Sequence, residues 1–179
     1  GKTFADIDYV GVKSSQFSFA RLLKADPILG VDMSSTGEVA CIGDNYYEAL
    51  LKSMISVGCS FPSKEKWILI SSGPAKAKAE MLEATHRLKE HGYTIYSTGG
   101  TAKFLKENGI DTIQLHWPDE NVSPNIMDYL KGHKIDLVIN IPKNHTQREL
   151  DNGYTIRRTA VDFNIQLITN ARMASALIY

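Results

Sequence analysis

Residues 97–101, which read STGGT, have the composition of an anion-binding turn. The strand-like residues YTIY precede them and the helix-forming residues AKFL follow them. The two glycines let a ligand approach the backbone, and the first N–H groups of a helix have no partner within that helix. With the hydroxyls of Thr98 and Thr101, the turn suits a phosphate or a carboxylate. The alternative is an ordinary strand-to-helix turn whose hydroxyls cap the helix.

Polar residues also follow the other apolar runs of this region. If these runs are parallel strands, their carboxyl ends meet at one edge of a sheet, where ligands of such sheets bind. We therefore expect five short segments to converge on one rim: residues 71–73, 97–101, 116–117, 140–144 and 169–170.

Several rim residues have both a binding and a structural interpretation. Lys78 can pair with an anion or remain solvated, as most helix lysines do. Trp117 can stack on a ligand or fill the core. Asn140 ends an apolar strand and, if buried, needs hydrogen-bond partners that either a ligand or a loop can supply. Arg157 or Arg158 can reach a carboxylate ligand or form a structural salt bridge.

Groups for acid–base or metal chemistry are sparse in the sequence. No paired carboxylates stand at strand ends, and the nearest acids, Asp119 and Glu120, fall in a loop. The five histidines form no H-x-x-x-H pair, and the two cysteines lack metal-ligand spacing. We therefore predict neither catalytic residues nor a metal site, and a rim that binds rather than reacts.

From Trp67 onward, strand patterns alternate with helix patterns. This order favours an α/β fold with a parallel five-stranded sheet and helices on both faces, a three-layer arrangement. The first helix, over 74–91, buries a stripe of residues 77, 81, 84 and 88. A later one begins at Ser123 as cap and Pro124 as first helical residue. The last helix before the fifth strand spans 155–164.

Residues 1–60 have a different composition, with short strands, turns and one helix at 45–57 that Asp44 caps. Residues 59–66 read as a linker because they contain Pro62 and Ser63. We therefore predict two domains, 1–60 and 61–179. Since the chain starts without Met and in the middle of a pattern, we expect it to be a fragment of a longer one.

The bulk composition is that of an ordinary globular protein, with 43% hydrophobic and 22% charged residues among 179. The formal net charge is zero, which does not favour a nucleic-acid or membrane partner. No apolar run reaches the roughly 18 residues that span a bilayer. The two cysteines are expected to be reduced thiols in a cytosol-like compartment.

Three segments together, STGGTAKFL, IDLVINIP and TIRRTAVDFNIQLITN, resemble the methylglyoxal-synthase-like regulatory domain at the C-terminus of carbamoyl-phosphate synthase large subunits. The segments DPILGVDMSSTGEVACIG and YYEALLKSMISVG resemble the end of the second ATP-grasp domain of the same enzyme. The resemblance covers essentially the whole chain in the right order. It implies a Rossmann-like regulatory domain preceded by a small α+β remnant of the ATP-grasp domain, and apolar surface exposed around Tyr46, Tyr47 and Phe61.

The family's effector is a small molecule with a phosphate or carboxylate group, such as UMP, IMP, PRPP, ornithine or N-acetylglutamate. The effector site that the resemblance implies comprises Ser72, Lys78, Thr98, Thr101, Trp117, Asn140, Lys143 and Thr169. Two of these depart from known patterns. Trp117 stands where bacterial members carry lysine and animal members tryptophan, and Lys143 stands where the N-acetylglutamate type has asparagine. The pocket therefore combines residues typical of different family members, and the identity of its effector is left undecided.

For the parent enzyme, the resemblance implies carbamoyl phosphate formation for pyrimidine or arginine synthesis. ATP and Mg²⁺ or Mn²⁺ would be its cofactors, with K⁺ as a further ion. Expected partners are the rest of the large subunit and a glutamine amidotransferase subunit or domain, with self-association through this domain as a further option. The expected compartment is the cytoplasm, or the mitochondrial matrix for a chain from a ureotelic animal.

Two enzymes of this fold are the alternative. Methylglyoxal synthase has a G-G-D loop where this chain reads WPDENVSPN, and a catalytic aspartate where it has Pro142 and Lys143. IMP cyclohydrolase domains share STGGTA but continue into a GRVKTLHP-type segment that this chain lacks. Neither accounts for residues 1–60, and a shared fold does not carry a function.

Overall fold

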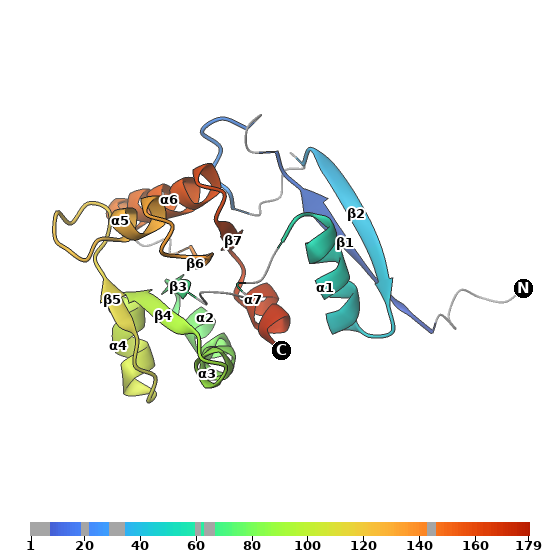
Figure 1. Ribbon diagram of the computed structural model, residues 1–179, viewed down its shortest axis with the longest axis horizontal. Coiled ribbons are helices and arrows are strands. Elements are labelled where there is room, and N and C mark those ends of the chain that lie inside the picture. Colours follow the sequence, from blue (N-terminus) through green and yellow to red (C-terminus); the bar gives the residue numbers. More distant parts are fainter. Residues whose placement is uncertain (1–7, 19–21, 29–34, 60–61, 63–66, 143–145) are drawn as a thin grey trace, which may run out of the picture. The chain divides into compact units, whose positions relative to one another are not determined.

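The computed structural model describes residues 8–18, 22–28, 35–59, 62, 67–142 and 146–179 (Figure 1). They form two compact units, one from the rest of residues 1–60 together with Tyr179 and one from residues 61–178 and a short segment of the N-terminal part. Residues 24–28 belong to the second unit, although in sequence they fall inside the first. The assignment of the first unit to a particular domain family stays a prediction.

The first unit is a two-stranded sheet with one helix. Strand β1 (Val10–Gln16) pairs antiparallel with β2 (Gly37–Gly43), and α1 (Tyr46–Ser56) packs against both. Tyr46 and Tyr47 are about half exposed, at 49% and 54%, which confirms the expected apolar surface there. Phe61, the third residue of that prediction, lies outside the described residues.

The N-cap of α1 differs from the prediction by one residue. The side chain of Asn45, not Asp44, accepts a hydrogen bond from the backbone N–H of Glu48 at 3.0 Å. In return, the Glu48 carboxylate accepts from the N–H of Asp44 at 2.8 Å. The two bonds form a reciprocal capping box in which Asp44 lies one position before the cap.

The second unit contains a parallel five-stranded sheet, as predicted. Its spatial order is β5-β4-β3-β6-β7. The strands are β3 (Trp67–Ser72), β4 (Thr94–Thr98), β5 (Ile113–Leu115), β6 (Leu137–Ile141) and β7 (Gln166–Ile168). The chain builds the sheet outward from β3 in one direction and then resumes at β6 on the other side. The boundary between β3 and β6 is therefore the point where strand order reverses.

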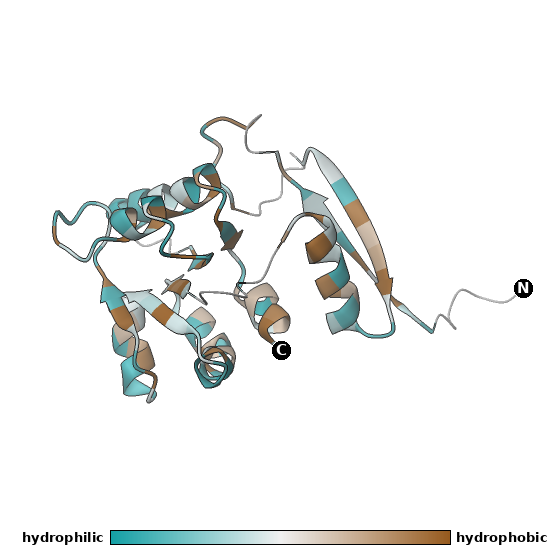
Figure 2. Ribbon diagram, viewed as in Figure 1, coloured by the Kyte–Doolittle hydropathy of each residue, from teal (hydrophilic) through white to brown (hydrophobic). Residues whose placement is uncertain are grey.

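Helices cover both faces of this sheet, which completes the predicted three layers (Figure 1). Helices α5 and α6 lie on one face and α2, α3, α4 and α7 on the other. Their bounds are α2 (Ala75–Glu80), α3 (Leu82–Glu90), α4 (Gly99–Glu107), α5 (Ile126–Lys131), α6 (Gln147–Asp162) and α7 (Ala171–Ile178). Figure 2 shows hydrophilic and hydrophobic residues side by side along these helices, as expected of amphipathic helices.

The core follows the predicted periodicity. The stripe Ala77, Met81, Ala84 and Leu88 is buried, with each side chain at most 9% exposed. The predicted single helix over 74–91 is instead two helices that break at Met81. No helix in the described part of the chain is long and apolar enough to cross a bilayer.

Two helix starts differ from the prediction. Helix α5 begins at Ile126, because Asn125 rather than Ser123 caps it by accepting from the N–H of Met127 at 2.9 Å. Helix α6 begins at Gln147, eight positions earlier than predicted. Its N-cap is Thr146, whose hydroxyl accepts from the N–H of Glu149 at 3.2 Å.

Candidate functional site

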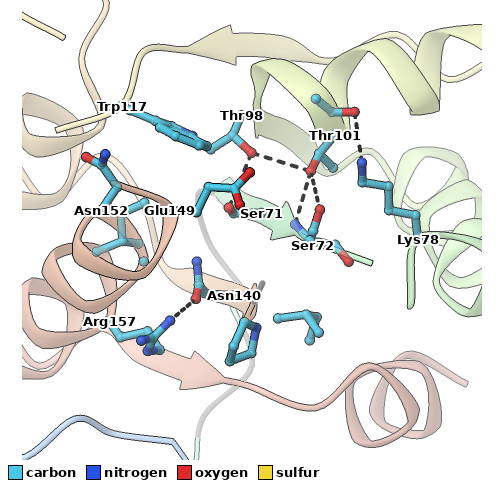
Figure 3. Close-up of a pocket in the computed structure, with 16 residues that line it drawn as sticks. Ser71, Ser72, Lys78, Thr98, Thr101, Trp117, Asn140, Glu149, Asn152 and Arg157 are labelled. Carbon is cyan, nitrogen blue, oxygen red and sulfur yellow. Dashed lines mark hydrogen bonds between the residues drawn. The ribbon is translucent and has the colours of Figure 1, made fainter. Parts of the chain in front are cut away.

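A pocket lies where strand order reverses, at the carboxyl ends of β3, β4 and β6 (Figure 3). Its cavity is small, about 70 Å³, and it opens to solvent. The described lining residues come from these strand ends and from α2, α4 and α6. They are Ser71, Ser72, Gly73, Lys78, Thr98, Gly100, Thr101, Trp117, Asn140, Ile141, Pro142, Glu149, Asn152, Gly153, Ile156 and Arg157.

The predicted turn is tied to the central strand by the Thr101 hydroxyl. This hydroxyl accepts from the N–H of Ser72 at 3.0 Å and donates to the Ser72 carbonyl at 3.2 Å. The Thr98 hydroxyl oxygen lies 3.2 Å from Ser71 Oγ and 3.4 Å from Thr101 Oγ1. Its single proton can be donated to only one of them at a time. Thr101 therefore fixes the turn on β3, whereas Thr98 is the hydroxyl that a ligand can recruit.

Ser72 supplies a buried hydroxyl to the pocket. The residue is 6% exposed, and its Oγ has no hydrogen-bond partner among the described residues. Buried polar groups nearly always have a partner, because an unmade hydrogen bond costs about 1–3 kcal/mol. Since Ser72 lines the pocket, a ligand is a natural partner for its hydroxyl.

The ammonium of Lys78 lies beside the first turn of α4. Its ammonium donates to the Gly100 carbonyl at 3.2 Å and lies 6.0 Å from the centre of the Phe104 ring. The residue is half-buried, not fully solvated as a surface lysine is. Gly100 is the second residue of α4, so the ammonium and the positive end of the helix dipole lie together.

Asn140 has a fixed orientation because of Arg157. The Nη1 of Arg157 donates to Asn140 Oδ1 at 2.8 Å. A guanidinium can only donate, so the amide oxygen faces Arg157 and the amide NH₂ points away from it. Figure 3 shows this nitrogen directed toward Ser71. Asn140 is 3% exposed, so the pocket receives a buried donor.

Arg157 is itself neutralised within the second unit. Its Nε and Nη2 donate to the two carboxylate oxygens of Asp26 at 2.8 Å and 2.7 Å. Arg157 is 2% exposed, and Gly153 makes room for it, because a Cβ at Gly153 would lie 2.9 Å from Nη1. The structure therefore contains the salt bridge that was the structural alternative for Arg157.

The Trp117 loop is held by a group of charged and amide side chains. Arg148 lies 5.2 Å from the centre of the Trp117 ring. It also pairs with the carboxylates of Asp119 and Glu120. The Trp117 carbonyl accepts from Asn125 Nδ2 at 2.8 Å. Arg148 thus covers one face of the indole, and the loop keeps Trp117 at the pocket.

The pKa values of this loop are shifted by the same contacts. The hydrogen bond from Arg148 holds the pKa of Asp119 below its ordinary value. The backbone N–H of Trp117, followed by His116 and Arg148, lowers the pKa of Glu120. The two carboxylates in turn raise the pKa of Arg148. Asp119, Glu120 and Arg148 therefore keep their charges throughout the neutral range.

The structure brings together six of the eight predicted effector residues, listed here in sequence order: Ser72, Lys78, Thr98, Thr101, Trp117 and Asn140. Lys143 lies outside the described residues. Thr169 follows β7 and is not one of the described lining residues. A role of any of them in ligand binding stays a prediction.

Sequence reasoning missed the contribution of the first two turns of α6. Glu149, Asn152 and Gly153 line the pocket because α6 begins at Gln147. The signal was present: Thr146 followed three residues later by Glu149 is a capping-box pattern. Figure 3 shows the Glu149 carboxylate directed toward Ser71 and Thr98.

The lining combines hydrogen-bond donors with one acidic group. Its hydroxyls, buried amide NH₂, lysine and helix N-terminus suit acceptor oxygens, whereas the Glu149 carboxylate opposes a second negative charge. The described members include no histidine and no cysteine. In the described part of the chain, no group of three histidine, cysteine, aspartate or glutamate residues is placed to hold a metal ion.

Comparison with known proteins gives a family match over the pocket region. Residues 80–169 match the family model described as "MGS-like domain". The chain is 45% identical over 177 residues to the multifunctional protein pyr1-3 of Dictyostelium discoideum. It is 43% identical over 166 residues to the mitochondrial carbamoyl-phosphate synthase (ammonia) of Aquarana catesbeiana.

These relatives are much longer than the chain. The first alignment covers 96% of this chain and 8% of the relative, and the second covers 91% and 11%. Among solved structures, methylglyoxal synthase from Elizabethkingia anophelis NUHP1 matches with a TM-score of 0.46 and 14% identity, over 64% of this chain and 78% of that one.

Proposed function

Because this chain belongs to the MGS-like domain family, we propose that its second unit is an effector-binding regulatory domain of a carbamoyl-phosphate synthase. The observation that carries the proposal is one pocket with four donors from four elements. These are the Ser72 hydroxyl, which has no partner among the described residues, the Thr98 hydroxyl, the Asn140 NH₂ and the Lys78 ammonium. Such a set is complementary to the oxygens of a phosphate or carboxylate.

The relatives support the place of this domain in a larger enzyme. Since the chain spans 8–11% of their length, the activity of the whole protein is part of the proposal. We infer a parent that forms carbamoyl phosphate with ATP and Mg²⁺ or Mn²⁺, with K⁺ as a further ion. Its partners would be the remainder of the synthase and a glutamine amidotransferase subunit or domain.

The pathway and the compartment follow from the kind of parent. Similarity to multifunctional proteins favours pyrimidine synthesis in the cytoplasm. Similarity to a mitochondrial synthase keeps the arginine pathway and the mitochondrial matrix as the second option. The effector that binds would tell these two pathways apart, because nucleotides and N-acetylglutamate differ in size and charge.

The ligand class follows from the shape of the lining. A phosphate or carboxylate would lie against the STGGT turn, with Lys78 as counter-charge and the Ser72 and Asn140 donors at its base. Trp117 adds an aromatic surface at the loop. Nucleotides such as UMP and IMP, the sugar phosphate PRPP, ornithine and N-acetylglutamate are the compounds to compare.

Regulation would act by population shift. The ligand would contact β3, β4, β6 and α2 at once, so it would favour any arrangement of the parent in which these elements keep their present spacing. A differential affinity worth about 1–3 kcal/mol is typical of such coupling. The sign of the effect depends on which arrangement of the parent is active.

The test is calorimetric titration of the chain with UMP, IMP, PRPP, ornithine and N-acetylglutamate. The tightest binder is then titrated into Thr98→Ala and Lys78→Ala. Loss of a charge-assisted contact should weaken binding about 10- to 100-fold for Lys78→Ala. Lys76→Ala, one residue before the buried Ala77, is the matched control and should bind as the parent chain does. Unchanged affinity in both pocket variants rejects this site, and turnover of dihydroxyacetone phosphate would favour an enzyme.

A further inference from the structure

Arg157 connects the pocket to a segment that lies far away in sequence. Its three hydrogen bonds run to Asn140 in the pocket and to both oxygens of Asp26. Asp26 is 131 positions away in sequence, and residues 24–28 fall between β1 and β2 of the first unit. One buried guanidinium therefore serves the pocket and this segment together.

Helix α6 holds the segment through one face. Tyr154, Arg157 and Arg158 stand at positions i, i+3 and i+4, which places them side by side. The Tyr154 hydroxyl donates to the Lys24 carbonyl at 3.1 Å, and Arg158 Nη1 lies 3.5 Å from the Ala25 carbonyl. Asp26 supplies the charged contact. Another part of the same helix, at Asn152 and Gly153, lines the pocket.

Asp26 holds the Arg157 guanidinium in the orientation that fixes Asn140. A buried guanidinium without a counter-ion is costly. Asp26 accepts from Nε and Nη2, and Nη1 is thereby directed at Asn140 Oδ1. Without Asp26, Arg157 would lose two of its three hydrogen bonds, and the Asn140 amide would no longer have one fixed orientation.

We propose that Asp26 is a built-in counter-ion that, through Arg157, fixes Asn140 as a donor toward the pocket, so that ligand binding and attachment of residues 24–28 strengthen each other. Asp26 and Arg157 are positioning residues, since neither needs to contact the ligand. The ligand half of this inference rests on the proposed function. The link between Asn140 and the segment does not, because it exists in the ligand-free chain.

The first experiment needs no ligand. Backbone ¹⁵N order parameters of residues 24, 25, 26 and 28 are measured by NMR relaxation in the 179-residue chain and in Asn140→Ala and Arg157→Lys. We expect them to fall in both variants, from values near 0.85, typical of rigid backbone, toward values below about 0.6, typical of flexible backbone. Asn152→Ala is the matched control, because this buried asparagine lines the pocket but contacts Asp119 and Arg148 instead. Unchanged order parameters in Asn140→Ala and Arg157→Lys would overturn the link.

The second experiment tests the ligand half with UMP and N-acetylglutamate as probes. Asp26→Asn should weaken the probe that binds by roughly fivefold or more, and Asp26→Glu should restore much of the affinity, because coupling is reciprocal. The same probe should raise the order parameters of these residues in the parent chain and not in Asp26→Asn. Equal or higher affinity of Asp26→Asn relative to the parent chain refutes the coupling. If neither probe binds the parent chain, the proposed function fails for these compounds, and the order parameters alone decide the link.

Discussion

The hydroxyl of Thr101 binds both backbone groups of a single residue, Ser72, accepting from its N–H and donating to its carbonyl. Both residues are buried, at 2% and 6% exposure. A side chain of α4 thereby completes the hydrogen bonding of β3 at the strand end where the pocket begins.

Thr101→Val should destabilise the second unit by about 2–3 kcal/mol, because it leaves two buried backbone groups of Ser72 unpaired. Thr101→Ser should keep most of the stability, since it retains the hydroxyl. Urea unfolding followed by tryptophan fluorescence measures both. If Thr101→Val unfolds at the same urea concentration as the parent chain, the hydroxyl is not the link between α4 and β3.

Ser72→Ala should leave the stability of the second unit nearly unchanged and weaken ligand binding. Its Oγ has no partner among the described residues, so its removal should change the free energy of unfolding by less than about 0.5 kcal/mol or raise it. The affinity for the pocket ligand should still fall about 2- to 10-fold, the value of one neutral hydrogen bond. Thermal unfolding with and without ligand separates the two effects. A variant that binds as tightly as the parent chain would show that the hydroxyl does not face the ligand.

Gly153→Ala should cost stability, although alanine favours helices by about 1 kcal/mol over glycine. The new Cβ would lie 2.9 Å from Nη1 of Arg157, a group that its contacts with Asp26 and Asn140 hold in place. Gly100→Ala is the control, because the nearest atom to its Cβ is Lys78 Nζ at 3.8 Å. Chemical denaturation of both variants tests the difference. A more stable Gly153→Ala would mean that the guanidinium yields without loss.

The Trp117 loop should respond to acid. The lowered pKa values of Asp119 and Glu120 mean that their contacts contribute stability in full above the ordinary values of 3.8 and 4.5, and that this stability is lost as pH falls through the lowered values. Fluorescence of Trp117 in a Trp67→Phe background should therefore change as pH falls below about 4.

Arg148→Met provides the control for that titration. It removes the cation that lies on Trp117 and that pairs with both carboxylates. The variant should show at neutral pH much of the altered fluorescence that the parent chain shows only in acid. An acid transition of the same size in both proteins would mean that Arg148 does not hold the loop.

The sequence was sufficient to predict the sheet and its pocket edge. Continuous apolar runs mark strands buried on both faces, and the stripe from Ala77 to Leu88 marks a helix that packs on them. Since parallel strands end at one edge, the polar residues that follow them were expected to meet. Ser72, Thr98 and Asn140 do so because each occupies such a strand end.

The part that could not be predicted depends on contacts without a local pattern. Asn152 and Gly153 are weak helix formers, and they are helical because Asn152 bonds the Asp119 N–H and the Arg148 carbonyl. The pairing of Asp26 with Arg157 joins positions that no periodicity relates. Thr146 and Glu149 were readable as a helix start, but the two weak formers after them obscured it.

The placement of Asp26 bears on how this protein is dissected. Domain dissection normally assumes that one cut in the chain separates two folding units, and here the natural cut falls near residue 60. A polypeptide excised there would include every described lining residue of the pocket and lose the carboxylate that neutralises Arg157. Such a truncated piece could fold and still misreport the selectivity of the intact site, so residues 22–28 would need to be supplied on the same polypeptide or as an added peptide.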